Sequence, residues 1–565
     1  MSLEETELFD VIEHDSLESV KSNSDHTILE ATNNIPTNIS RNTENNYEDM
    51  AFKSLCLTLR CEFKEACQML ISYVDNHPAV CGAYAANQFL RAVFLLSDIQ
   101  TEISLRNLAS TSVKLKEFTN NKQKLLSYSA KIFLADCCVF YAILLFTRQN
   151  KISYVKGALR LHQAWKIYQN INDVLSATEN GSSDLDTDDF KRIQGMTSFG
   201  FGLSNLVLTM LSPRIKTWLE FIGVPSGDRQ LGLERLRYSL NIPNEIHSPI
   251  SAIVLIVYYG YVESITYVDL KHRSRCLEEM HLYLDQSKFY FENSPLDGIF
   301  KLYSTESEDD VYAICKESKY YSTDYPELIE LSFLIHKCLV DMARQNYSDA
   351  RYILERVIKE TSWNRSIYIY VSALCLGAEE NNVKFKDVQN RLKTAQKYDL
   401  YEDDKFAESR IKFLSTIKCT KDIFKLFCIE ILYHWNSLCY ANKSDLNVYM
   451  QILRKLDGKV NFEALICFLQ GVILKHQRSY SEAEVLLLAA KCPKYTESRL
   501  AFVQPFSCIE LARCSVNRVD SDENEAKQYL MEVLETSTFK GFDFEQKANF
   551  LAHNMLNKLN VNYKL

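Results

Sequence analysis

Residues Ala464–Ala490 read ALICFLQGVILKHQRSYSEAEVLLLAA, and their side-chain sizes follow a fixed spacing. With Ala464 as position 1, small residues stand at positions 8, 20 and 27, and larger residues stand at positions 17 and 24. Small side chains let two antiparallel helices approach closely, and the larger ones fill the space left between the helices. The stretch therefore predicts a helical hairpin held together by Gly471, Tyr480, Ala483, Leu487 and Ala490.

The same spacing recurs in three other parts of the chain. A second unit starts near Leu331 and contains Cys338, Tyr347, Ala350, Leu354 and Val357. A third starts near Ser507 and contains Cys514, Ala526, Leu530 and Val533, and an N-terminal helix pair contains Phe63, Ala66 and Leu70. The spacing resembles the 34-residue tetratricopeptide repeat, whose helical hairpins stack into a superhelix. Generic helical hairpins with fortuitous alanines are the alternative interpretation.

The composition favours helices over other fold classes. The chain has 565 residues, of which 47% are hydrophobic and only 15 are Gly and 10 are Pro. β-Sandwiches and barrels need a turn roughly every 8–12 residues, so this scarcity of turn formers argues against them. Gly195 and Gly200 mimic a P-loop frame, but Phe201 stands where the lysine belongs. We predict an all-α fold: a superhelical array of antiparallel helix pairs, a tetratricopeptide-like solenoid with a divergent N-terminal helical half.

Charge divides the chain unevenly. The net charge is −9, yet residues 1–50 alone hold 12 acidic and 2 basic side chains, so the rest is nearly neutral. We predict a disordered acidic tail at 1–48, a divergent helical-repeat domain at 49–320 and a tetratricopeptide-repeat domain at 321–565. A short acidic amphipathic helix at Leu3–Val20 is the alternative for the tail. The near-neutral body gives no electrostatic footprint for a nucleic acid.

Three apolar stretches predict buried central helices. They are Leu125–Phe146, Phe199–Leu211, which ends before Pro213, and Ile250–Tyr261, which follows Pro249. Their apolar residues cover most of a helix circumference, which is typical of a helix buried on nearly all sides. No uninterrupted apolar run reaches the roughly 18–20 residues that span a bilayer. The N-terminal residues do not resemble a signal peptide, so we expect the 17 Cys to be reduced core residues of an intracellular protein.

The sequence carries no recognisable catalytic or metal-binding motif. It has no CxxC pair, no HExxH and no GxSxG. His272 and His281 are nine residues apart, which is not the four-residue step that places two side chains on one helix face. We therefore predict no enzyme activity, no catalytic residue, no cofactor and no bound metal.

Two central segments point to a particular family. They are Ile152–Tyr168, ISYVKGALRLHQAWKIY, and Gly200–Leu233, GFGLSNLVLTMLSPRIKTWLEFIGVPSGDRQLGL. Together they resemble the tetratricopeptide repeat protein 39 family, which includes the fungal inclusion body clearance proteins. The features that carry the resemblance include Lys156, Gly157, Trp165, Tyr168, Pro213, Arg214, Glu220, Phe221, Gly223, Gly227, Asp228 and Arg229. The dipeptide Val224-Pro225 departs from the expected pattern.

The second segment has a structural and a functional interpretation. Structurally, Gly223 and Gly227 permit a tight turn and Asp228 caps the next helix. Functionally, Arg214, Glu220, Asp228 and Arg229 would form an exposed polar binding site. The sequence leaves both open.

The resemblance implies a non-catalytic, protein-binding scaffold. It further implies clearance of inclusion bodies of misfolded protein, a form of protein quality control linked to lipid-droplet proteins. The implied locations are cytoplasm and nucleus, with peripheral association with lipid droplets or the mitochondrial outer membrane. A peripheral protein that holds a lipid or sterol among its apolar helices is the alternative function.

Overall fold

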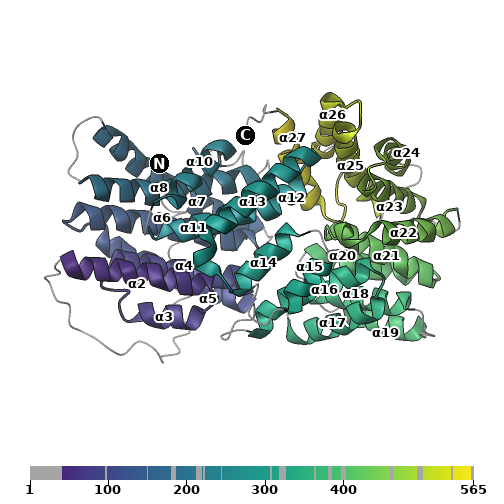
Figure 1. Ribbon diagram of the computed structural model, residues 1–565, viewed down its shortest axis with the longest axis horizontal. Helices are drawn as coiled ribbons and strands as arrows, with labels where there is room; N and C mark the ends of the chain where they lie inside the picture. Colours follow the sequence, from purple (N-terminus) through teal and green to yellow (C-terminus); the bar gives the residue numbers. More distant parts are fainter. Residues whose placement is uncertain are drawn as a thin grey trace.

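The structure is a computed structural model that describes residues 41–560, except 96–97, 149–150, 180–185, 212–218, 221–222, 225, 243–244, 306–307, 317–325, 362–363, 380–384, 396–401, 459–461, 493–499 and 536–538. Every regular element in these residues is a helix, which confirms the predicted all-α class. Figure 1 shows the helices packed as two halves, with α13 crossing the region between them.

The first half runs from purple to teal in Figure 1. It contains α2 (Arg41–Leu59), α3 (Phe63–Ile71), α4 (Pro78–Leu95), α5 (Asp98–Phe118), α6 (Lys124–Phe146), α7 (Lys151–Glu179), α8 (Thr187–Met210), α10 (Arg229–Leu240), α11 (His247–Val257), the π-helical turn η1 (Tyr258–Val262), α12 (Glu263–Thr266), α13 (Leu270–Phe291) and α14 (Pro295–Ser304). The next helix in the chain, α15 (Glu308–Lys316), packs beside the first helix of the second half.

The second half runs from green to yellow in Figure 1. It contains α16 (Pro326–Ala343), α17 (Tyr347–Glu360), α18 (Arg365–Ala378), α19 (Phe385–Ala395), α20 (Glu402–Leu414), α21 (Lys421–His434), the 3-10 turn η3 (Leu438–Tyr440), α22 (Lys443–Leu456), α23 (Glu463–His476), α24 (Tyr480–Lys491), α25 (Val503–Asn517), α26 (Glu523–Leu534) and α27 (Glu545–Asn560). The predicted domain boundary at 320–321 lies outside the described residues.

The hairpin at Ala464–Ala490 forms as predicted, from α23 and α24. A Cβ placed on Gly471 would lie 2.7 Å from Leu487 Cγ and 3.2 Å from the Ala483 carbonyl oxygen, so a larger residue at this position would force its neighbours to shift. The unit near Leu331 forms α16 and α17, where the Cys338 thiol points at the Ala350 carbonyl oxygen, 3.6 Å away. The other two predicted pairs form α25–α26 and α2–α3. In all four units the residues of the pattern are buried, except Tyr480, which is half-buried.

The three apolar stretches form buried central helices. α6 and α8 are buried along most of their length, and α11 begins two residues before Pro249, which therefore sits in its first turn. Two helical segments, Lys124–Phe146 and His247–Thr266, are long and apolar enough to cross a membrane by length and composition. In the folded chain, 72% and 67% of their most apolar 18-residue stretches are buried, as expected of core helices.

The structure moves two predicted boundaries. α2 begins at Arg41, so residues 41–48, predicted to belong to the disordered tail, are helical. Packing explains the difference, because Tyr47 stacks on His77 and Glu48 forms a two-point ion pair with Arg192 at 2.5 and 2.6 Å. The helix predicted at Leu3–Val20 lies outside the described residues. The composition of residues 176–189, SATENGSSDLDTDD, also predicts an exposed acidic loop, but its two ends belong to α7 and α8.

Candidate functional site

Tyr168 lies at the centre of the first half. It is fully buried, and its hydroxyl donates a hydrogen bond of 2.5 Å to Asp136 Oδ1 on α6. A Cβ on Gly200 of α8 would stand 2.2 Å from Tyr168 Cζ, so the absence of a side chain at Gly200 makes room for this ring. The two segments that carry the family resemblance therefore meet through Tyr168 and Gly200.

Asp136 also belongs to a buried ionic triad. Its Oδ2 lies 2.7 Å from His247 Nε2, and His247 Nδ1 lies 3.0 Å from Glu245 Oε1, with all three side chains at most 3% exposed. Burial lowers the pKa of His247, but the Glu245 and Asp136 carboxylates outweigh burial and raise the pKa to about 10. His247 is therefore an imidazolium that donates from both ring nitrogens.

The second segment builds a tight crossing of α8 and α10. Gly202 and Gly232 face each other so closely that a Cβ on Gly202 would lie 2.8 Å from the Gly232 carbonyl oxygen. Gly227 has a φ of +84°, and a Cβ there would lie 2.7 Å from the Asn205 carbonyl oxygen. Asp228 caps α10 by accepting from the Leu231 N–H at 3.0 Å, the capping role predicted for it.

The remaining motif residues divide between packing and the surface. Trp165 packs against Phe201 with ring centroids 4.7 Å apart, and Gly157 makes room for a neighbouring aromatic ring. Lys156 and Glu220 are exposed, and Gly223 occupies an exposed turn with a φ of +87°. Pro213, Arg214 and Phe221 lie outside the described residues.

Arg229 turns inward from this segment to Glu263, the first residue of α12. Its Nη1 donates to Glu263 Oε1 at 2.9 Å, an oxygen that also accepts from the Tyr258 hydroxyl at 2.6 Å. Arg229 therefore has its partners within the fold, whereas the side chain of Asp228 is exposed and caps α10.

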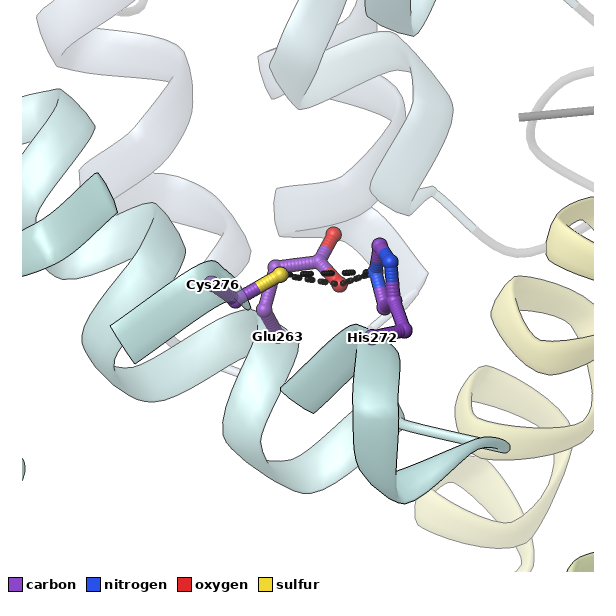
Figure 2. Close-up of side chains that lie close together, drawn as sticks. All are labelled: Glu263, His272 and Cys276. Atoms are coloured by element: carbon purple, nitrogen blue, oxygen red, sulfur yellow. Dashed lines mark hydrogen bonds and ion pairs between the residues drawn. The ribbon is translucent and has the colours of Figure 1, made fainter. Parts of the chain in front are cut away.

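Glu263 is the centre of a second buried polar network. Its Oε2 accepts from Lys558 Nζ of α27 at 2.6 Å and lies 3.0 Å from His272 Nε2 of α13. Figure 2 shows the Cys276 thiol beside them, 3.4 Å from His272 Nε2 and 3.8 Å from Glu263 Oε2. Burial raises the pKa of Glu263, but Lys558, the His272 hydrogen bond and Arg229 together hold that pKa well below its usual range.

The ligand atoms of Glu263, His272 and Cys276 all lie within 4.8 Å of one another, as in a metal site. A metal would require the thiolate of Cys276, yet burial and the Glu263 carboxylate raise the thiol pKa to about 12. It would also face the Lys558 ammonium and the Arg229 guanidinium, which already neutralise the carboxylate. The group therefore fits an ionic hydrogen-bond network better than a metal centre.

Sequence reasoning missed this network. Its signal was the spacing of His272 and Cys276, four residues apart and thus on one helix face. Comparison of His272 with His281 alone leaves Cys276 out of consideration. The partner Lys558 could not be inferred from spacing, because it lies 295 residues from Glu263.

A cavity of about 220 Å³ opens beside this network, between the α12–α13 junction and the C-terminal repeats. No aspartate or glutamate is among its thirteen described lining residues. These are Tyr267, Leu270, Arg273, Leu438, Cys439, Ala441, Leu446, Lys475, His476, Arg478, Tyr480, Arg513 and Asn517.

A buried carboxylate, Glu510 on α25, holds two of the cavity's cations in place. It accepts from Lys475 Nζ at 2.6 Å and from Arg513 Nη1 at 2.7 Å. Burial raises the Glu510 pKa, but Arg513 and Lys475 outweigh it and lower the pKa to about 2. Arg513 also donates to the Ile265 and Tyr267 carbonyl oxygens, which ties α25 to the end of α12.

Comparison with known families gives one result for this chain. A family model described as Iml2/Tetratricopeptide repeat protein 39 matches residues 54–477. The matched range includes both segments that carry the resemblance, the triad around Asp136, and Glu263 with His272 and Cys276, but not Lys558. It ends at the start of the α23–α24 turn.

Proposed function

Because the chain belongs to the Iml2/Tetratricopeptide repeat protein 39 family, we propose that it acts as a non-catalytic scaffold that binds other proteins. The supporting observation is the stack of helical hairpins, since such arrays present an extended surface for partners. The buried polar clusters do not argue for catalysis, because the charged groups around Asp136 and Glu263 already neutralise one another away from solvent.

The finer proposal concerns the process in which the scaffold acts. We propose that it participates in clearance of inclusion bodies of misfolded protein, with partners among lipid-droplet proteins. Its locations would be cytoplasm and nucleus, with peripheral contact to lipid droplets or the mitochondrial outer membrane. The family resemblance supports this proposal.

The experiment is deletion and rescue in cells that carry a fluorescent aggregating reporter. Cells without the protein should clear inclusions more slowly, and the wild-type chain should restore the rate. Crosslinking followed by affinity purification of the tagged chain should recover the same partners in repeated stressed cultures. Unchanged clearance would contradict the process, whereas absence of any reproducible partner would contradict the scaffold.

A lipid-associated protein is the second candidate. Its support is the pair of helical segments apolar enough to cross a membrane, together with exposed apolar side chains at the start of α5 and α7, namely Ile99, Ile103, Ile152 and Val155. An ion pair connects Glu102, which precedes Ile103 on α5, with Arg148, which lies just before the start of α7. This candidate predicts that the purified chain floats with liposomes and that Ile99→Ser with Ile152→Ser reduces flotation. Flotation unaffected by both changes, or absent altogether, would count against it.

A further inference from the structure

The helices of the C-terminal hairpins are covered unequally. Three of the twelve residues of α24 and three of the twelve of α26 are buried, whereas twelve of the fifteen residues of α25 are buried. Part of the cover over α25 comes from α27, and the two residues before α27, Asp543 and Phe544, reach further, to α20 and α21. The chain therefore covers with its own C-terminal part a side of the repeats that hairpin arrays can offer to partners.

Phe544 inserts its ring where three helices meet. It is buried, with its ring centroid 4.7 Å from that of Phe406 on α20 and 4.5 Å from that of His434 on α21. The His434 ring lies in turn 4.9 Å from Phe502 and 5.5 Å from Phe506, at the start of α25. These three helices thus share one aromatic cluster, and Phe544 is the ring that the C-terminal part adds to it.

Asp543 supplies a carboxylate beside that ring. Its Oδ2 accepts from Arg410 Nη1 at 2.9 Å, and the Ser409 hydroxyl donates to the same oxygen at 3.4 Å. The Arg410 guanidinium is fully buried and lies over the Phe406 ring. Arg410 also donates to Glu430, from Nε at 3.1 Å and from Nη2 at 3.0 Å. Because Glu430 stays with Arg410, departure of Asp543 does not leave this guanidinium without a carboxylate.

The fit of these two residues is imperfect. Phe544 has a φ of +62°, the left-handed conformation that strains a residue with a Cβ, at the point where the chain turns into α27. Both ring nitrogens of His434 are buried, and neither has a hydrogen-bond partner among the described residues. Burial raises the pKa of Asp543, although Arg410 and Ser409 oppose it. A separate peptide does not have to turn into α27, so it can place the same carboxylate and ring without the strain.

We propose that Asp543 and Phe544 are a built-in ligand of the C-terminal repeats, and that protein partners displace them with a segment in which an acidic residue directly precedes a phenylalanine. The inference rests on the proposed scaffold function and names the chemistry that the scaffold recognises. Displacement is local, because Lys558 still holds the far end of α27 on Glu263. The partner's carboxylate takes the place of Asp543 beside Arg410.

The test uses the full-length chain and a labelled peptide of its residues 539–547, FKGFDFEQK, whose binding is followed by fluorescence anisotropy. The double variant Asp543→Asn, Phe544→Ala loses its built-in ligand and should bind the peptide about tenfold more tightly than the wild type. Phe539→Ala, at a half-buried phenylalanine of the same connection, is the control and should change the affinity less than about twofold.

A second arm leaves the protein unchanged. The peptide in which Asp543 is changed to Asn, or Phe544 to Ala, should bind the double variant about tenfold more weakly than the unchanged peptide. Hydrogen exchange of the wild type should show that residues 541–547 become less protected when the peptide is added in excess. This readout needs only the wild type, so it decides the question even when the double variant is unstable.

Three results would overturn the proposal. They are equal affinity of the wild type and the double variant, equal binding of the altered peptides, and peptide that is absent from the protein or that binds while residues 541–547 stay protected.

Failure of this proposal is distinguishable from failure of the scaffold. Affinity purification from stressed cells should recover more partner protein with the double variant than with the wild type. Partners recovered in equal yield from both forms would overturn the displacement and leave the scaffold intact. No partner from either form, together with tight peptide binding, would overturn the scaffold and leave the built-in ligand.

Discussion

Tyr168 connects three parts of the first half through one side chain. Its ring occupies the space that Gly200 leaves on α8, and its hydroxyl holds Asp136, which in turn holds the His247 imidazolium. A buried charged group is tolerated only when its partners are in place. The residues that identify the family therefore act here on the geometry of a buried ion network.

Substitution at Gly200 tests this packing. Gly200→Ala places a Cβ 2.2 Å from Tyr168 Cζ, so we expect a loss of about 1–3 kcal/mol in the free energy of unfolding. The coupling free energy between Gly200 and Tyr168 is measured by urea denaturation of the wild type, Gly200→Ala, Tyr168→Leu and the double variant. The double variant should lose clearly less than the sum of the two single losses, and strict additivity would contradict the contact.

The His247 triad predicts a pH dependence. The pKa of His247 is raised from 6.5 to about 10, so its contribution to stability is complete below about pH 6.5 and is lost as pH rises through 10. Between pH 7 and pH 9 this one group should lower the free energy of unfolding by up to about 1.4 kcal/mol per pH unit. Denaturation at pH 7, 8 and 9 should show a steeper decline for the wild type than for His247→Gln, and parallel curves would refute the assignment.

At the scale of elements, the packing of α23 against α24 depends on the absence of a side chain at Gly471. Gly471→Ala brings a Cβ to 2.7 Å from Leu487 Cγ and should destabilise the protein by about 1–3 kcal/mol. Leu487→Ala removes the obstructing group, so the double variant should be more stable than the two single losses predict. Chemical denaturation monitored by far-ultraviolet circular dichroism gives all four values. A double variant that loses the full sum would mean that the helices do not meet at this point.

Helical hairpins were predictable because their determinants are local. The sizes at Gly471, Ala483 and Leu487 and the proline of α11 act within a few turns of the chain. The start of α2 was not predictable from composition, because Glu48 finds its partner Arg192 144 residues away. The Asp136–His247 and Glu263–Lys558 pairs are separated by 111 and 295 residues, and no short-range pattern encodes which buried charges meet.

At the scale of the molecule, the two halves are joined by part-buried polar contacts. Lys558 reaches Glu263 and the Thr266 carbonyl oxygen, and Asn517 donates to the Val268 carbonyl oxygen at 2.6 Å. Arg513 adds its contacts to the end of α12. The short α12 and the turn after it therefore bind both α25 and α27. Figure 1 shows α12 beside α27, close to where the two halves meet.

Removal of Lys558 should weaken this junction. Lys558→Met leaves the Glu263 carboxylate with Arg229, Tyr258, His272 and the Cys276 thiol, and we expect a loss of about 3 kcal/mol in the free energy of unfolding. Adding Glu263→Gln removes the charge that lost its partner and should recover part of that loss. Differential scanning calorimetry should show the wild type as more cooperative than Lys558→Met. A loss below about 0.5 kcal/mol would mean that the pair does not join the halves.

The separation of Glu263 from Lys558 has a consequence for synthesis of the protein on the ribosome. The carboxylate is made 295 residues before the ammonium that neutralises it, which at 5–20 residues per second is a delay of roughly 15–60 seconds. During that interval the first half holds an acidic group at a surface that the last helix has yet to cover. A nascent chain that has not yet formed α27, or a chain truncated before it, leaves the Glu263 carboxylate without Lys558 and exposes this surface to chaperones and proteases.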